Sequence, residues 1–303
     1  MVKMRDLTSH AMLLGDFEKR KIRWKRRFGT LKVDFANELS WSLSGGHRIF
    51  DRFWRELAGS HRWIFIIGCN NSGTSLLQRL LDWTGQISTF PLEGQLYTRA
   101  LKRDRNPKFS RVWTEYLDEL QLRPGQSLER CPRLVHDWMI NLPRPLQHII
   151  VEKTPANTSR AEWLQEVFPD SRFIGLVRNG YAVTEGINRK ARQPYARGAR
   201  HWNMVNKLMV NTARNLDHYI EVRYENLAEK PASTMLEICR FVGLQNDLIE
   251  ELARSNEEEA AKLMVTKFGP VRNHDEETIR KLGTQNIVTI REQAAEMLEH
   301  FDY

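Results

Sequence analysis

The sequence predicts an α/β fold in which helices cover both faces of a central parallel sheet, giving three layers. Short apolar runs at residues 63–67, 149–151 and 173–177 are typical of strands buried on both faces. A polar or glycine-containing turn follows each run, and a predicted helix follows each turn. This alternation of strand and helix favours right-handed βαβ units and therefore a parallel sheet.

Composition and charge limit the class of protein. The chain has 303 residues, of which 41% are hydrophobic and 28% charged, as is typical of a soluble globular protein of one or two domains. Its net charge of +8 suits an anionic substrate, cofactor or surface. The three cysteines, Cys69, Cys131 and Cys239, predict neither a disulfide framework nor a zinc site. Because no apolar run approaches a membrane span and no signal-peptide pattern opens the chain, we expect a cytoplasmic protein.

Residues 1–60 differ from the rest and predict a basic helical N-terminal extension, followed by one α/β domain over residues 61–303. Residues 19–27 form a dense basic run with one tryptophan, Trp24. One interpretation is contact with an anionic surface such as a bilayer, which would place the protein at the periphery of a membrane. The interpretation that we favour is a solvated helix face. The sequence indicates no specific nucleic-acid partner and predicts no oligomeric state.

A glycine loop follows the first predicted strand. Gly68 and Gly73 are separated by four residues, which is the spacing of a P-loop, and a predicted helix follows. Such a loop aims backbone N–H groups and the positive end of the helix dipole at one point, where an anion can bind. Thr74 and Ser75 stand where a nucleotide triphosphatase has lysine and then serine or threonine. The loop therefore predicts a P-loop-like fold that is poorly equipped for phosphoryl transfer. The alternative is a turn with a purely structural role.

Basic residues stand at the ends of the other two predicted strands. Lys153 follows the second strand, and Arg178 follows the third. Open α/β sheets bind their ligands at the carboxyl ends of the strands. Either side chain could be an ordinary surface charge, but together with the glycine loop they indicate one anionic ligand.

The segment between the first two strands has the least motif content. Glu93 lies in the proline-containing stretch 88–94, which we expect to be an extended loop that folds back over the glycine loop. Residues 100–148 carry apolar side chains at helical spacing and predict a helical insertion with irregular ends. This insertion is the natural place for acceptor specificity.

The remaining elements are structural. Ser159 and Glu162 have the spacing of a capping box, which predicts a helix that opens there. Apolar stripes predict two further core helices, one after Pro231 and one over residues 287–301.

Four ordered motifs resemble those of sulfotransferases that use 3'-phosphoadenosine 5'-phosphosulfate (PAPS). They are Ser-Gly-Thr at 72–74, Glu-Lys-Thr-Pro at 152–155, FPDSRFIGLVRNGYAV at 168–183 and Val-Arg-Tyr-Glu-Asn-Leu at 222–227. The resemblance covers about residues 63–244 and is greatest to the tyrosylprotein-type and bacterial branches. It implies transfer of a sulfuryl group to a hydroxyl or amine of an acceptor such as a carbohydrate, lipid, natural product or peptide tyrosine. The product would be adenosine 3',5'-bisphosphate, and no metal would be required.

The resemblance also implies roles for individual residues. Glu93 would be the catalytic carboxylate that removes the acceptor's proton, and Lys153 would stabilise charge on the transferring group. Tyr224 would lie near the adenine or ribose. The other cofactor-binding residues would be Asn71, Ser72, Gly73, Thr74 and Ser75 at the 5'-phosphosulfate, Arg178 and Lys190 at the 3'-phosphate, and Lys267 and Arg272 on a late loop over the 3'-phosphate.

Two positions in the cofactor site depart from the family pattern. Asn71 stands where the family usually has lysine or arginine, and asparagine donates hydrogen bonds but supplies no charge. Gly186 stands where the family has a serine that would bind the cofactor, and Thr184 lies on a different helical face. Other basic residues therefore hold the cofactor, or its binding is weaker, or the chemistry has changed.

Two other classes of function remain as alternatives. A P-loop phosphoryl transferase would share the glycine loop, but the lysine after Gly73 is missing. A non-catalytic basic scaffold would bind lipid or nucleic acid through residues 19–27, with a steep dependence on salt.

Overall fold

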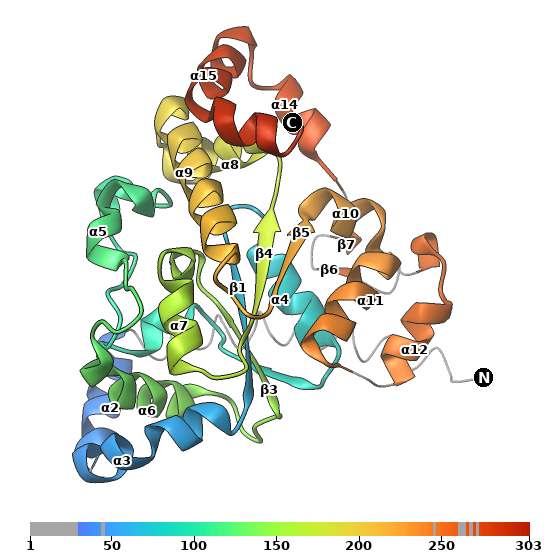
Figure 1. Ribbon diagram of the computed structural model, residues 1–303. Helices are drawn as coiled ribbons and strands as arrows, with labels where there is room; N and C mark the ends of the chain where they lie inside the picture. Colours follow the sequence, from blue (N-terminus) through green and yellow to red (C-terminus); the bar gives the residue numbers. More distant parts are fainter. Residues whose placement is uncertain (1–29, 44–45, 245–246, 260–264, 267–268, 271–272) are drawn as a thin grey trace.

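The computed structural model describes residues 30–43, 46–244, 247–259, 265–266, 269–270 and 273–303. Their centre is a five-stranded sheet with the order β2-β3-β1-β4-β5, in which all neighbouring strands are parallel (Figure 1). The three predicted strands are confirmed as β1 (Arg62–Gly68), β3 (Ile149–Lys153) and β4 (Arg172–Val177). Since parallel strands end at one edge, the glycine loop, Lys153 and Arg178 share that edge.

The outer strands are β2 (Ile87–Thr89) and β5 (Tyr219–Arg223). The sequence analysis expected only an extended loop at 88–94, whereas β2 pairs with β3, from Ile87 opposite Ile149 to Thr89 opposite Val151. Three residues are too few for a periodic pattern, so β3, and not local sequence, makes this segment a strand. Phe90, which follows β2, is fully buried in the core, and the chain continues from there to Glu93.

Each face of the sheet has its own apolar core, which confirms the three layers. Along β1, Trp63 and Phe65 point to one face and Ile64 and Ile66 to the other, as alternation in a strand requires. The first face is aromatic, and the ring of Trp63 lies 4.4 Å from that of Phe168 between centroids. Its helices are α6 (Cys131–Asn141), α7 (Ala161–Val167), α8 (Gly180–Ala191), α9 (Tyr195–Ala213) and α15 (Thr284–His300). Those of the second face are α4 (Thr74–Trp83), α11 (Pro231–Val242) and α12 (Asp247–Arg254).

Short elements connect these layers and shape the site. Within the predicted insertion they are η2 (Pro107–Phe109), η3 (Trp113–Tyr116), α5 (Leu117–Leu120) and η4 (Leu128–Arg130). Around the sheet edge they are η1 (Gly94–Tyr97), η5 (Pro155–Arg160), α10 (Tyr224–Glu229) and α14 (Asp275–Arg280). The strands β6 (Val265–Thr266) and β7 (Gly269–Pro270) pair antiparallel as a separate two-stranded sheet.

The described part of the N-terminal extension forms two helices, α2 (Thr30–Leu43) and α3 (Gly46–Gly59). Figure 1 shows both beside α6, at the opposite end of the molecule from α14 and α15. Val33 and Trp54 are buried in the aromatic core, and Asp34 pairs with Arg103 of the insertion. The basic run 19–27 lies outside the described residues, and the division of the chain at residue 60 stays a prediction.

The predicted capping box at Ser159 is wrong. The Ser159 hydroxyl donates instead to the carbonyl of Ala156 at 2.8 Å, and no side chain caps α7. A six-residue 3₁₀ segment, η5, runs into α7, so the helix has no free first turn at Ser159. The two late core helices are confirmed as α11 and α15. Across the ranges that the structure describes, no helix is long and apolar enough to cross a bilayer.

Candidate active site

The glycine loop lies between β1 and α4, at the carboxyl edge of the sheet. Its backbone is left-handed at Asn71 (φ 71°) and at Gly73 (φ 98°), and Gly68 has φ 136°. A Cβ on Gly68 would collide with the backbone carbonyl of Leu176 in β4, so only glycine fits there. Residue 73 is the N-cap of α4, which places the N–H groups at the start of this helix at the loop.

Several polar atoms of the loop are buried and have no partner within the described part of the chain. They include the hydroxyl of Ser72, the amide nitrogen of Asn71 and the amide oxygen of Asn70. Ser72 is only 1% exposed. Buried polar groups are nearly always hydrogen-bonded in folded proteins, so these atoms indicate a place where a polar ligand binds.

Three of the predicted cofactor-binding residues meet at this loop. Lys190 Nζ donates to Asn71 Oδ1 at 3.0 Å, and an Arg178 nitrogen donates to the Asn71 carbonyl at 3.3 Å. The Arg178 guanidinium lies 3.9 Å from the centroid of the Tyr224 ring, and a Cβ on Gly73 would come within 2.7 Å of that ring. Arg178, Lys190 and Tyr224 thus surround the short segment from Asn71 to Gly73.

Two charged residues that the sequence analysis did not assign also reach this cluster. Asp275, at the start of α14, accepts hydrogen bonds from Arg178 Nε at 3.1 and 3.4 Å and from the Arg178 Nη2 nitrogen at 2.5 Å. Arg111, between η2 and η3, donates to Asn71 Oδ1 at 3.1 Å. Neither belongs to a motif, and they lie 97 and 40 positions from their partners. No local sequence signal could have found these contacts.

The two departures from the family pattern lie side by side. A Cβ on Gly186 of α8 would lie 3.5 Å from the Asn71 side chain, which is an ordinary van der Waals distance, so Asn71 does not require glycine at position 186. Thr184 is fully buried, and its methyl group would be 3.2 Å from a Cβ on Gly198 of α9. The Thr184 methyl group therefore faces α9, and its buried hydroxyl has no partner among the described residues. Lys267 and Arg272 lie outside the described residues.

Glu93 and Lys153 form an ion pair at the same edge of the sheet. Lys153 Nζ donates to Glu93 Oε1 at 3.2 Å, and Gln95 donates to the other carboxylate oxygen at 2.9 Å. The Lys153 side chain is 7% exposed and that of Glu93 is 30% exposed. A half-buried carboxylate beside a buried ammonium is suited to take a proton next to a group that gains negative charge.

A second carboxylate, Glu152, holds this pair in place. It is fully buried and accepts hydrogen bonds from the Gly94 N–H at 2.7 Å and from the side chains of Thr154 and Asn157, both at 2.5 Å. Burial raises the pKa of Glu152 to about 6, although the hydrogen bonds from Thr154 and Gly94 oppose that shift. Glu152 thereby ties the end of β3 to the backbone next to Glu93. Its place in Glu-Lys-Thr-Pro was the only signal for it in the sequence.

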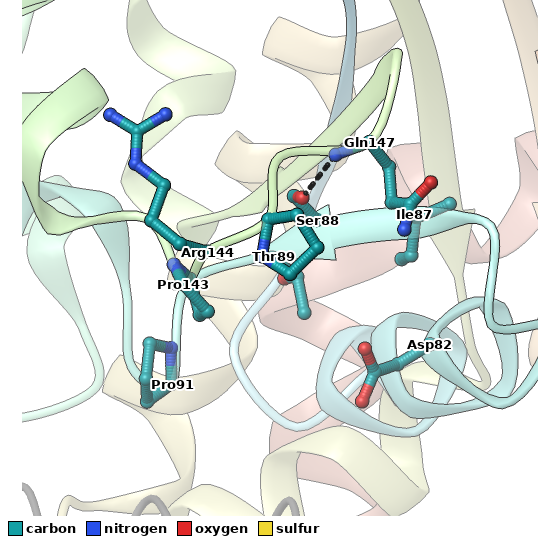
Figure 2. A pocket seen from close by; sticks show the side chains of 9 residues that line it. Asp82, Ile87, Ser88, Thr89, Pro91, Pro143, Arg144 and Gln147 are labelled. Atoms are coloured by element: carbon teal, nitrogen blue, oxygen red, sulfur yellow. Dashed lines mark hydrogen bonds between the residues drawn. The ribbon is translucent and has the colours of Figure 1, made fainter.

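A separate cavity of about 270 Å³ lies against β2 (Figure 2). Figure 2 shows Ser88 beside Gln147, whose backbone N–H donates to the serine hydroxyl at 2.9 Å. The residues that line it are Asp82, Ile87, Ser88, Thr89, Pro91, Pro143, Arg144, Pro145 and Gln147. None of them is a predicted site residue, so this cavity is distinct from the site around the glycine loop.

Comparison with known families agrees with this geometry. Residues 63–247 match the family described as "Sulfotransferase family". The chain belongs to this family. The match spans the sheet, the glycine loop, the Glu93–Lys153 pair and Arg178.

Similar proteins carry the same family name. The chain is 25% identical over 242 residues to a Protein-tyrosine sulfotransferase of Drosophila melanogaster, covering 72% of this chain and 46% of that protein. It is 23% identical over 278 residues to Protein-tyrosine sulfotransferase A of Caenorhabditis elegans, covering 79% and 67%. This sulfotransferase-family chain thus spans about half the length of the Drosophila relative.

Solved structures share the fold. The sulfotransferase domain from the curacin biosynthetic pathway has a TM-score of 0.52 at 16% identity and covers 81% of this chain and 99% of its own. Sulfotransferase STF9 from Mycobacterium avium also has a TM-score of 0.52, at 13% identity, and covers 84% and 81%. At this identity the likeness concerns the fold alone. It confirms the predicted P-loop-like α/β class.

Proposed function

We propose that this sulfotransferase-family protein transfers a sulfuryl group from PAPS to a hydroxyl or amine of an acceptor. The observation that carries the proposal is the Glu93–Lys153 pair, with an N–O distance of 3.2 Å, at the sheet edge that also holds the glycine loop. One side chain can accept the proton of the acceptor, and the other can neutralise charge on the donor.

The residues at the glycine loop fit the donor. The unpartnered Ser72 hydroxyl and Asn71 amide nitrogen are donors for an anion, as are the backbone N–H groups where α4 begins. Arg178 and Lys190 add positive charge at the same loop, and the Tyr224 ring offers a flat surface next to Arg178. PAPS, when bound, supplies the activated sulfuryl group. We propose that Asn71 to Ser75 hold its 5' side, and that Arg178 and Lys190 hold its 3'-phosphate.

Within this proposal Glu93 acts as the general base, and Lys153 stabilises negative charge on the donor. Glu93 takes the proton as the acceptor oxygen or nitrogen attacks. Gln95 fixes one oxygen of that carboxylate, so the other oxygen and its bound Lys153 face the reacting groups. When Glu93 becomes protonated, Lys153 would be released to donate its hydrogen bond to the leaving oxygen of the donor and neutralise the charge there.

The acceptor class is the open part of the proposal. The names of the two relatives favour a tyrosine in a protein or peptide. A carbohydrate, lipid or natural product would meet the same chemistry at Glu93. Asp104 of the insertion lies close enough to Glu93 for their charges to interact, so we propose that residues of the insertion choose the acceptor.

The experiment compares binding and turnover in Glu93→Gln and in the control Glu129→Gln. Glu129 is an exposed carboxylate of the insertion. Titration calorimetry with adenosine 3',5'-bisphosphate measures binding, and transfer from radiolabelled PAPS to phenol, sugar and amine acceptors measures turnover. We expect Glu93→Gln to lower kcat about 10²- to 10⁴-fold with an unchanged dissociation constant, and the control to change neither. Undiminished turnover would remove Glu93 as the base, and metal-dependent binding of ATP without bisphosphate binding would favour a phosphoryl transferase.

A further inference from the structure

We propose that Arg111, on the insertion, is a ligand of the cofactor's 3'-phosphate, beside Lys190 and Arg178. This inference rests on the proposed function. It turns the insertion from a neighbour of the donor site into a part of it.

The first observation is a shared amide oxygen. Arg111 donates to Asn71 Oδ1 at 3.1 Å, and Lys190 donates to the same oxygen at 3.0 Å. A guanidinium and an ammonium are therefore held close together, and Arg178 bonds the backbone of the same asparagine. Like charges repel at this separation, so the arrangement gains stability when an anion lies between them.

The second observation is that neither side chain is ion-paired with a carboxylate among the described residues. The charge of Glu185 acts on Lys190, but Glu185 is itself ion-paired with Arg189. Within the described part of the chain, neither Arg111 nor Lys190 has an ion pair, whereas Arg178 is paired with Asp275. Asp104 feels the charge of Arg111, but its own carboxylate is bonded by the Tyr116 hydroxyl. Desolvation of the ammonium, and next the charge of Arg111, lowers the pKa of Lys190. An anion at this place would offset the repulsion between the two cations.

The third observation concerns Asn71 itself. Asparagine tolerates the left-handed backbone found here. The amide oxygen accepts hydrogen bonds from both cations. The buried amide nitrogen is left as a donor without a partner among the described residues. Asn71 is thus a neutral bridge that orients two cations, instead of a cation in its own right.

Arg111 is also firmly supported. The next two residues, Val112 and Trp113, are fully buried, and the Trp113 ring meets His201 of α9 edge-on at 5.4 Å between centroids. Thr114 and His201 share a hydrogen bond of 2.8 Å. These contacts fasten the start of η3 to α9, so Arg111 projects toward the glycine loop from a rigid base.

The test measures the affinity of Arg111→Gln for adenosine 3',5'-bisphosphate and for adenosine 5'-monophosphate, which lacks the 3'-phosphate. We expect the dissociation constant of the bisphosphate to rise about 10- to 100-fold, the usual effect of losing one charge-assisted hydrogen bond. Binding of the monophosphate should be unchanged. The control is Arg123→Gln, which removes the same charge from an exposed part of the insertion.

A second variant separates a ligand from a structural support. Arg111→Lys keeps a cation at the same position and should restore bisphosphate affinity to within a few-fold of wild type. If the wild type binds bisphosphate and Arg111→Gln binds it equally well, Arg111 is not a ligand and only this inference fails. Equal weakening of both nucleotides, or failure of the second variant to restore binding while its melting temperature is unchanged, would also overturn it. No bisphosphate binding by the wild type would instead overturn the proposed function.

Discussion

The pair formed by Arg178 and Asp275 gives a prediction that can be worked out from the structure. Asp275→Asn keeps the shape of the side chain and removes its charge. In the folded protein the two side chains are 17% and 6% exposed, and two nitrogens of the guanidinium donate to the carboxylate. The variant leaves a buried cation whose neutralising partner is gone.

The size of the effect follows from the contacts that remain. Removal of one partner from a buried ion pair typically costs about 3–5 kcal/mol. Arg178 would not be left wholly uncompensated, because it keeps its bond to the Asn71 carbonyl, its position over the Tyr224 ring and the nearby charge of Glu225. Asparagine also retains an oxygen that accepts a neutral hydrogen bond. We therefore expect a net loss of about 2 kcal/mol in the free energy of unfolding.

Urea unfolding of wild type and Asp275→Asn measures this loss. The control is Glu277→Gln on the same helix, because the Glu277–Lys281 pair is exposed and its removal should leave the midpoint unchanged. Saturating adenosine 3',5'-bisphosphate should stabilise the variant more than the wild type, since the phosphate takes the place of the lost carboxylate. Equal midpoints for wild type and variant without ligand would refute the reasoning about the buried pair. Equal ligand effects would show that the phosphate does not meet Arg178.

Three further predictions concern backbone fit and pH. Gly68→Ala should lower the free energy of unfolding in urea by several kcal/mol, because the new Cβ collides with β4. The control Gly85→Ala should lower it by about 1 kcal/mol, because φ is 70° there but nothing lies within 4 Å. Similar losses in the two variants would contradict this. Burial raises the pKa of Glu152 from 4.5 to about 6, so the folded state keeps a proton that the unfolded state has released. The proton on Glu152 therefore stabilises the folded state by about 2 kcal/mol below pH 4.5, and this contribution is lost as the pH rises to about 6. Glu152→Gln should lack this fall in unfolding free energy with pH. Parallel profiles of stability against pH for the two proteins would refute the prediction. The pKa of Lys190 is lowered, so affinity for the bisphosphate should fall as the pH rises through it, and Lys190→Arg should not show that fall in calorimetric titrations.

The sequence predicted the parts of the fold that local pattern decides. β1 is apolar on both faces and flanked by glycine, so only a buried strand suits it. β2 has only three residues and is a strand because it pairs with β3. That pairing is long-range, so no local sequence pattern predicts it. The predicted capping box is wrong because residues 155–160 form a 3₁₀ segment, in which the Ser159 hydroxyl donates to the carbonyl of Ala156.

The site divides in the same way. Lys153 and Arg178 were predicted because the carboxyl ends of parallel strands meet, whatever joins them. Glu93 came from the resemblance, and its contact with Lys153 depends on the fold of the segment after β2. Arg111 and Asp275 come from segments without motifs, and only long-range packing brings them to the loop. Their charges could be counted in the sequence, but not located.

The distribution of positive charge supports one orientation of the donor. Arg111, Lys190 and Arg178 all bond Asn71, whereas Lys153 pairs with Glu93. A terminal phosphate monoester carries nearly two negative charges at neutral pH, and a sulfuryl group linked to phosphate carries one. The more highly charged group therefore gains most beside the three cations Arg111, Lys190 and Arg178, and the transferring group needs only the single ammonium. The missing lysine after Gly73 fits this division, since a second cation at the transferring end would favour a more highly charged group such as a terminal phosphate.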